Sequence, residues 1–119
     1  MKKVLPYILA VILLLGAVAH LAAPAFYAPM VPDFIPLSLA NILSFVLEAG
    51  IGILLLIPKY RAWGGLGFMV LMIGFLPIHI WDMLKEAPAV GPPPAPQIRV
   101  AMQFLLIYAG YWMYRVYRK

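Results

Sequence analysis

Four apolar runs, each about twenty residues long, dominate this sequence and limit the folds open to it. They cover residues 4–23, 37–57, 62–82 and 98–117. A helix rises about 1.5 Å per residue, so about twenty residues cross a hydrocarbon core of ~30 Å. Apolar and polar residues do not alternate strictly along the runs, which argues against a transmembrane β-barrel. The sequence therefore predicts an all-α membrane protein, with residues 1–119 forming one four-helix transmembrane bundle.

Composition supports a lipid environment and excludes several kinds of chemistry. The chain is 66% hydrophobic and 11% charged, whereas soluble domains average about 25% charged residues. It has no cysteine, which excludes thiolate catalysis, disulfide exchange and cysteine-ligated iron–sulfur clusters within this chain. The net charge is +5, but binding of nucleic acid needs a basic face on a soluble domain, and the sequence shows no such domain. We therefore predict no nucleic-acid partner.

The basic residues predict the orientation of the bundle. Seven of them lie at the chain ends and in the second loop, namely Lys2, Lys3, Lys59, Arg61, Arg115, Arg118 and Lys119. The positive-inside rule therefore places both termini in the cytoplasm of a bacterial-type inner membrane, with multi-pass topology. The positive charge also favours contact with anionic membrane lipid. The first run resembles a secretory signal peptide as well, but its length favours a retained helix.

Proline-rich segments form the two outer loops. Prolines interrupt residues 24–36 repeatedly, and because proline fixes φ and removes an amide donor, no long helix is expected there. The aromatic residues of this segment suit an interfacial anchor or, alternatively, a lid over a site. Residues 85–97 are expected to form an extended outer segment.

The second run carries an acid where an ionised group is most costly. Asn41, Ser44 and Glu48 are spaced i, i+3 and i+7, so they share one face of a helix. Glu48 lies close to the bilayer midplane. An acid at that depth costs several times the ~0.6 kcal/mol that an interhelical hydrogen bond contributes on average. Glu48 is thus a candidate proton acceptor in a site, although a protonated carboxyl that only joins helices is the alternative.

The other runs place their polar side chains in the same outer half. Helical rise puts His20, His79 and Gln103 at similar heights, with Asp82 and Arg99 slightly further out. Such groups are expected to face the bundle interior. The predicted ligand-binding residues are His20, Asn41, Ser44, Glu48, His79, Asp82, Arg99 and Gln103.

Metal and haem binding are poorly supported. His20 and His79 lie at one depth on two helices, an arrangement open to an axial haem pair, but no attachment motif accompanies them. The spacing needed for a zinc site is also missing. We therefore predict no metal site and no intrinsic cofactor.

Several segments together resemble the DoxX-like family of small four-helix membrane proteins. They read GAVAHLAAPAFYAPMVPDFIP, LEAGIGILLLIPKYR, FLPIHIWDM and IRVAMQ. The family's polar positions match His20, Glu48, Arg99 and Gln103. His79 departs from the asparagine that many relatives carry. The founding member is a membrane subunit of a thiosulfate:quinone oxidoreductase, so the resemblance implies quinone as a candidate ligand and a link to membrane redox complexes.

Three functions are consistent with these features. The leading hypothesis is an outward-facing, polar-lined pocket that binds a small apolar ligand with a polar head, either quinone or lipid-like, in support of membrane redox chemistry. The second is a non-catalytic assembly or scaffold subunit beside a redox partner or in a homo-oligomer. The third, proton-coupled transport, is disfavoured because the inner half is nearly free of polar groups. The chain is predicted not to be an enzyme alone, but to act within a quinone-linked oxidoreductase if catalysis is involved.

Overall fold

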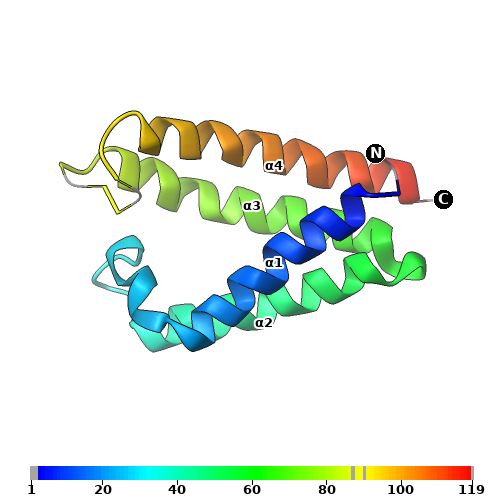
Figure 1. The fold of residues 1–119 in the computed structure, drawn as a ribbon, viewed down its shortest axis with the longest axis horizontal. Helices are drawn as coiled ribbons and strands as arrows, with labels where there is room; N and C mark the ends of the chain where they lie inside the picture. The colour runs from blue at the N-terminus through cyan, green and yellow to red at the C-terminus, as the bar shows by residue number, and fades with distance from the viewer. Residues whose placement is uncertain (1–2, 87, 90, 119) are drawn as a thin grey trace.

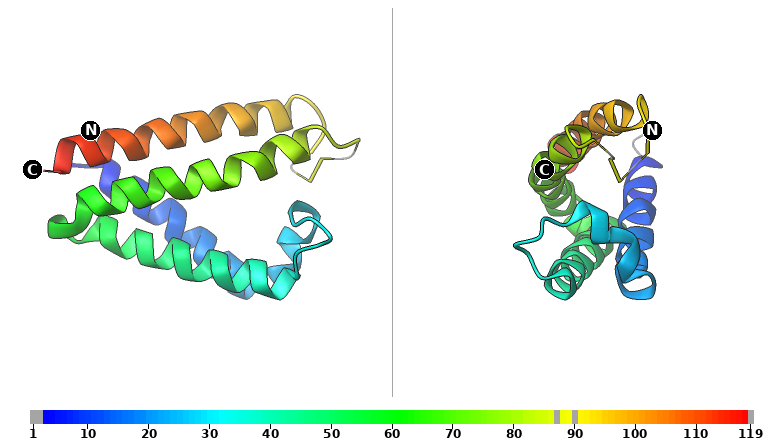
Figure 2. Two further views of the ribbon diagram at one scale, coloured as in Figure 1. Left: turned by 180° about the vertical axis from the view of Figure 1, so that it is seen from behind. Right: turned by 90° about the vertical axis from the view of Figure 1, so that its left-hand side faces the viewer.

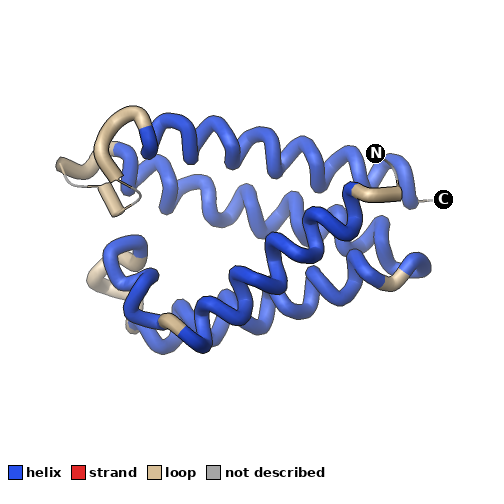
Figure 3. The backbone as a smooth tube through the Cα atoms, viewed as in Figure 1, coloured by secondary structure: helices blue, strands red, loops and turns tan. Residues whose placement is uncertain are grey.

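The computed structural model describes residues 3–86, 88–89 and 91–118, and most of this length is helical (Figure 3). Its elements are α1 (Leu5–Ala22), the short 3-10 helix η1 (Pro24–Met30), α2 (Leu37–Leu56), a second short 3-10 helix η2 (Pro58–Tyr60), α3 (Arg61–Met83) and α4 (Ala95–Tyr117). No strand occurs in the residues described. The predicted all-α class is confirmed.

The ends of the helices lie close to the predicted ranges. The largest difference is at α4, which begins at Ala95 rather than at residue 98. Pro94 and Pro96 permit this early start, because the first amides of a helix have no partner within it and proline lacks only such an amide. At the other end of the chain, α1 begins in the same way, with Pro6 in its first turn.

The four long helices form two antiparallel pairs. α1 packs along α2, α3 packs along α4, and α2 also packs directly against α3, to which the short turn at η2 joins it. Figures 1 and 2 show both chain termini at one end of the molecule and the two proline-rich loops at the other. The α1–α2 pair and the α3–α4 pair lie close together at the terminal end and diverge toward the loop end (Figure 1).

The hydrophobic core fills the terminal half of the molecule. Leu9, Leu13, Leu55, Phe68 and Met113 are almost completely buried there and come from all four helices. This packing holds the two pairs together at one end only, so the polar residues of the other end can surround a cavity.

α3 and α4 approach one another at two glycines. A Cβ atom added at Gly65 would lie 2.7 Å from the Cβ of Met113, and one added at Gly110 would lie 2.7 Å from the amide nitrogen of Met69. Such contacts are too short for real side chains, and small residues are what lets membrane helices pack backbone to backbone. The α3–α4 pair therefore depends on the absence of side chains at these positions.

A buried arginine stabilises the α2–α3 turn. The Nε atom of Arg61 donates a 2.9 Å hydrogen bond to the carbonyl of Leu55, one of the last carbonyls of α2, which lack partners within the helix. The guanidinium lies 5.1 Å from the ring centre of Tyr7 and 5.9 Å from that of Tyr117. Cation–π contacts of this kind compensate part of the cost of burying the charge.

η1 crosses the loop end between the two helix pairs, as the right-hand view of Figure 2 shows. It contacts α1, α2 and α3. The Nδ2 atom of Asn41 donates to the carbonyl of Pro24 at 3.3 Å, and the Nζ atom of Lys85 donates to the carbonyl of Pro29 at 2.7 Å. The expected absence of a long helix in this loop is confirmed, and the segment is attached to both pairs.

Three of the helices are long and apolar enough to cross a membrane. They are Leu5–Ala22, Leu37–Leu56 and the stretch Pro58–Met83 that contains α3. Their outward faces carry exposed side chains such as Leu15, Val46 and Val70, as expected of surfaces in contact with acyl chains. α4 is equally long but carries several tyrosines and Gln103, which lower its apolarity.

Candidate functional site

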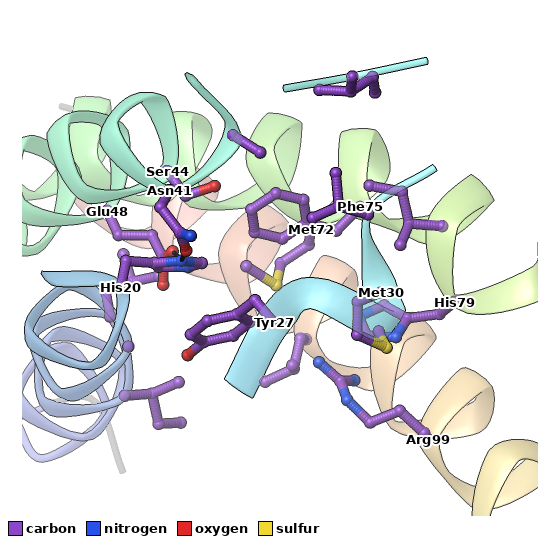
Figure 4. Close-up of a pocket in the computed structure, with 18 of the residues that line it drawn as sticks. His20, Tyr27, Met30, Asn41, Ser44, Glu48, Met72, Phe75, His79 and Arg99 are labelled. Carbon is purple, nitrogen blue, oxygen red and sulfur yellow. Dashed lines mark hydrogen bonds and ion pairs between the residues drawn. The ribbon is translucent and has the colours of Figure 1, made fainter. Parts of the chain in front are cut away.

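A cavity of about 300 Å³ lies between the two helix pairs beneath η1 (Figure 4). That volume is at the lower end of the ~300–1,000 Å³ typical of small-molecule sites. Its polar lining consists of His20, Tyr27, Asn41, Ser44, Glu48, His79 and Arg99. The remaining lining is apolar and includes Leu13, Met72, Phe75 and Leu106. All four helices thus contribute to one largely apolar cavity with a few polar groups.

His20, Asn41 and Glu48 form a buried polar triad between α1 and α2 (Figure 4). The Nδ1 atom of His20 lies 2.7 Å from the Oδ1 atom of Asn41. On the other side of the ring, Nε2 lies 2.9 Å from the Oε2 atom of Glu48. Both ring nitrogens are therefore engaged, and the imidazole is held in one orientation.

The hydrogen bonds of the triad determine where its protons lie. Asn41 donates through Nδ2 to the carbonyl of Pro24, so its Oδ1 faces His20 and must accept a hydrogen from Nδ1. The Nε2 atom of His20 and the Oε2 atom of Glu48 would repel one another if both presented lone pairs at 2.9 Å. One proton is consequently shared between them, either as a neutral acid and imidazole or as an ion pair. The arrangement can accept or release a proton facing the cavity.

The absence of a side chain at Gly16 makes room for the Glu48 carboxylate. A Cβ atom added at this glycine of α1 would overlap the Oε1 atom of Glu48. Gly16 also lines the cavity. Sequence reasoning did not single out this residue, because a lone glycine in an apolar helix gives no signal of what it faces.

Tyr27 of η1 covers the triad. Its ring stacks on the imidazole of His20, with centroids 3.9 Å apart and planes inclined by 20°. Burial raises the pKa of the Tyr27 phenol above its ordinary value of 10.0, and the nearby negative charge of Glu48 raises this pKa further. Tyr27 is thus a neutral hydroxyl at physiological pH, stacked on the triad and able to donate a hydrogen bond into the cavity.

We expect the Tyr27 phenol to ionise only at a pH above the range of a free tyrosine. The unfolded chain releases this proton near pH 10.0 while the folded chain retains it, so folding should lose stability as pH rises from the unfolded pKa to the folded one. The difference in phenolate absorbance between wild type and Tyr27→Phe, followed through an alkaline titration, isolates this group. A midpoint at or below that of free tyrosine would contradict the burial of the ring.

A second polar group, formed by His79 of α3 and Arg99 of α4, lies on the opposite wall of the cavity (Figure 4). The Nη1 atom of Arg99 donates a 2.8 Å hydrogen bond to the Oε1 atom of Gln103. Gln103 is completely buried, and its Nε2 atom donates to the carbonyl of Met72 at 2.7 Å. Gln103 thereby positions Arg99 and connects α4 to α3. The Nδ1 atom of His79 is buried and has no hydrogen-bond partner among the residues described.

A family model described as a domain of unknown function, DUF8561, matches residues 9–115. The chain belongs to this family. The match includes every residue that lines the cavity, so the candidate site lies wholly within the DUF8561 region. No curated protein and no solved structure matches the chain.

Six of the eight predicted site residues line the cavity of this DUF8561 chain. They are His20, Asn41, Ser44, Glu48, His79 and Arg99. Gln103 is fully buried and does not line the cavity, but it accepts a hydrogen bond from Arg99, which does. Asp82 is also buried and is not among the cavity-lining residues. Its Oδ1 atom lies 3.3 Å from the Nζ atom of Lys85 and accepts a hydrogen bond from the amide of Ala89 at 2.7 Å, so Asp82 organises the loop between α3 and α4.

Proposed function

We propose that this protein is a four-span inner-membrane protein whose cavity opens outward and binds a small, largely apolar ligand with a polar head. One observation carries the proposal: ionisable side chains from all four helices line a single, largely apolar cavity, namely His20, Glu48, His79 and Arg99. Polar groups within membrane helices are costly and are usually retained for function.

The membrane topology in this proposal rests on α4 and on the charges. α4 packs along α3, and its length of 23 residues corresponds to about 34 Å at 1.5 Å per residue, enough to cross the hydrocarbon core. The turn between α2 and α3, which contains Lys59 and Arg61, lies at the end that also holds the chain termini (Figure 1). Under the positive-inside rule that end is cytoplasmic, so the cavity faces outward.

The resemblance to DoxX-like proteins supports quinone or a lipid-like molecule as the ligand, in association with membrane redox chemistry. The triad suits such a ligand because it can accept or donate one proton at a polar head, while Phe75 and Leu106 contact an apolar body. An apolar cavity with few convergent polar groups is the usual form of a small-molecule site.

A pair of size variants tests the proposal. Ser44 lines the cavity, so Ser44→Phe fills it, whereas Leu43 is 54% exposed on the outer surface, so Leu43→Phe adds the same ring outside it. We expect mass spectrometry of the quinones and lipids carried through mild purification to show about tenfold less ligand per protein for Ser44→Phe, which corresponds to ~1.4 kcal/mol. Equal ligand in both folded variants would contradict the proposal. A cofactor-bearing partner chain carried equally by both variants would favour the scaffold alternative.

A further inference from the structure

Arg99 is a cavity-lining cation that forms no ion pair with any residue the structure describes. The two buried carboxylates at this end are each engaged by a cation other than Arg99, since Glu48 pairs with His20 and Asp82 with Lys85. Arg99 takes part in no ion pair among the residues described, and its one hydrogen bond is to the amide oxygen of Gln103. A half-buried guanidinium in a largely apolar cavity is costly unless an anion accompanies it.

His79 supplies a second unsatisfied group on the same wall. Its Nδ1 atom is buried and has no hydrogen-bond partner in the described part of the chain, and both His79 and Arg99 line the cavity (Figure 4). A buried polar atom without a partner destabilises the folded chain, because it has given up its hydrogen bonds to water. A ligand oxygen would satisfy Nδ1 when that nitrogen carries a hydrogen, and the remaining N–H groups of Arg99 could bind the same head.

From these two observations we infer that the ligand of this cavity is an amphiphile with an oxyanion head, carboxylate or phosphate, which Arg99 and His79 bind. The apolar part of the ligand packs against Met72, Phe75 and Leu106, which line the same cavity. Charge-assisted hydrogen bonds from arginine to an oxyanion are about twice as strong as neutral ones. This inference rests on the proposed function and, of the two ligand types proposed there, selects the lipid-like one over quinone by assigning an oxyanion head.

The test compares probes that differ only in the head. Decanoate, decyl phosphate, decanol and a decyl-substituted benzoquinone are added at neutral pH to the full chain in nanodiscs of zwitterionic phosphatidylcholine. Native mass spectrometry counts the bound probe. We expect at least one of the two oxyanion probes to bind about tenfold more tightly than decanol and the quinone, and the preferred probe identifies the head as carboxylate or phosphate.

Two arginine variants test whether the preference for oxyanion probes depends on Arg99. Arg99→Gln should lose the preference for the oxyanion probes while its affinity for decanol is unchanged. Arg115→Gln removes the same charge from the same helix, at an exposed position where Arg115 bonds Tyr111, and should bind all probes like wild type. The inference is overturned if decanol or the quinone binds wild type as tightly as decanoate and decyl phosphate, or if Arg99→Gln retains the preference.

The outcomes also separate this inference from the proposed function. Tight binding of neutral probes that Ser44→Phe abolishes would leave the cavity as a ligand site and refute only the oxyanion head. Failure of wild type to bind any of the four probes would refute both the head and the pocket.

Discussion

A Gly65→Ala variant is expected to unfold far more easily than wild type. The added Cβ atom would lie 2.7 Å from the Cβ of Met113, 2.8 Å from the amide nitrogen of Tyr114 and 2.9 Å from the carbonyl oxygen of Gly110. Two of these atoms belong to the backbone of α4, so the strain cannot be relieved by a rotamer change. Overpacking of this kind costs about 1–3 kcal/mol. Thermal unfolding in detergent, followed by circular dichroism, measures the loss.

Gly74→Ala provides the matched control within the same helix. A Cβ atom at Gly74 would meet nothing within 4 Å, so this substitution should leave stability unchanged or raise it by about 0.5–1 kcal/mol through the reduced flexibility of the unfolded chain. If the two alanine variants unfold at the same temperature, the close contact of α3 with α4 is wrong.

Glu48→Gln should abolish the pH dependence of decanoate binding without unfolding the bundle. The pair formed by His20 and Glu48 shares one proton, and losing that proton leaves a net negative charge beside the ligand. Decanoate should therefore bind wild type more weakly as pH rises through this step. A glutamine amide can still donate to the Nε2 atom of His20, but it cannot ionise. The affinity of Glu48→Gln for decanoate should stay level over the same range.

The size of the expected decrease in decanoate affinity is determined by the repulsion between the ionised pair and the carboxylate of the probe. A decrease of about tenfold in affinity corresponds to ~1.4 kcal/mol of repulsion, as expected of two negative charges within one cavity. Ser44→Ala retains the proton-sharing pair and slightly enlarges the cavity, so it should show the wild-type decrease. A decrease of the same size in Glu48→Gln would show that another group is responsible.

The helices and the identity of the polar residues could be predicted from the sequence because both depend on local patterns. A membrane-spanning helix needs an apolar run of fixed length, which the sequence displays directly. The depth of His20, Ser44 or His79 follows from helical rise alone. Because polar and charged side chains are costly in contact with lipid, such residues are expected to face the interior of the bundle. These arguments need no knowledge of how the helices pack against one another.

The pairing of the polar residues could not be predicted in this way, because it depends on the lateral order and rotation of the helices. From the sequence alone, Ser44 and Gln103 are the candidate hydrogen-bond partners of Glu48. In the structure α1 packs on α2, so Glu48 meets His20, and Gln103 instead bonds the carbonyl of Met72. The stacking of Tyr27 on His20 depends on the path of a loop, and loops have no periodicity from which to infer one.

The central proposal is that the largely apolar cavity between the helix pairs, with its few polar groups, opens to the outer side of the membrane. Because the chain has no cysteine, single cysteines report accessibility without background. A charged thiol reagent added outside right-side-out vesicles should label Ser44→Cys, since a thiol in a hydrated cavity can ionise, and decanoate should protect it. Leu43→Cys, on the outer surface of α2, should remain unlabelled among the acyl chains. Rapid labelling of Leu43→Cys with an inert Ser44→Cys would contradict the claim.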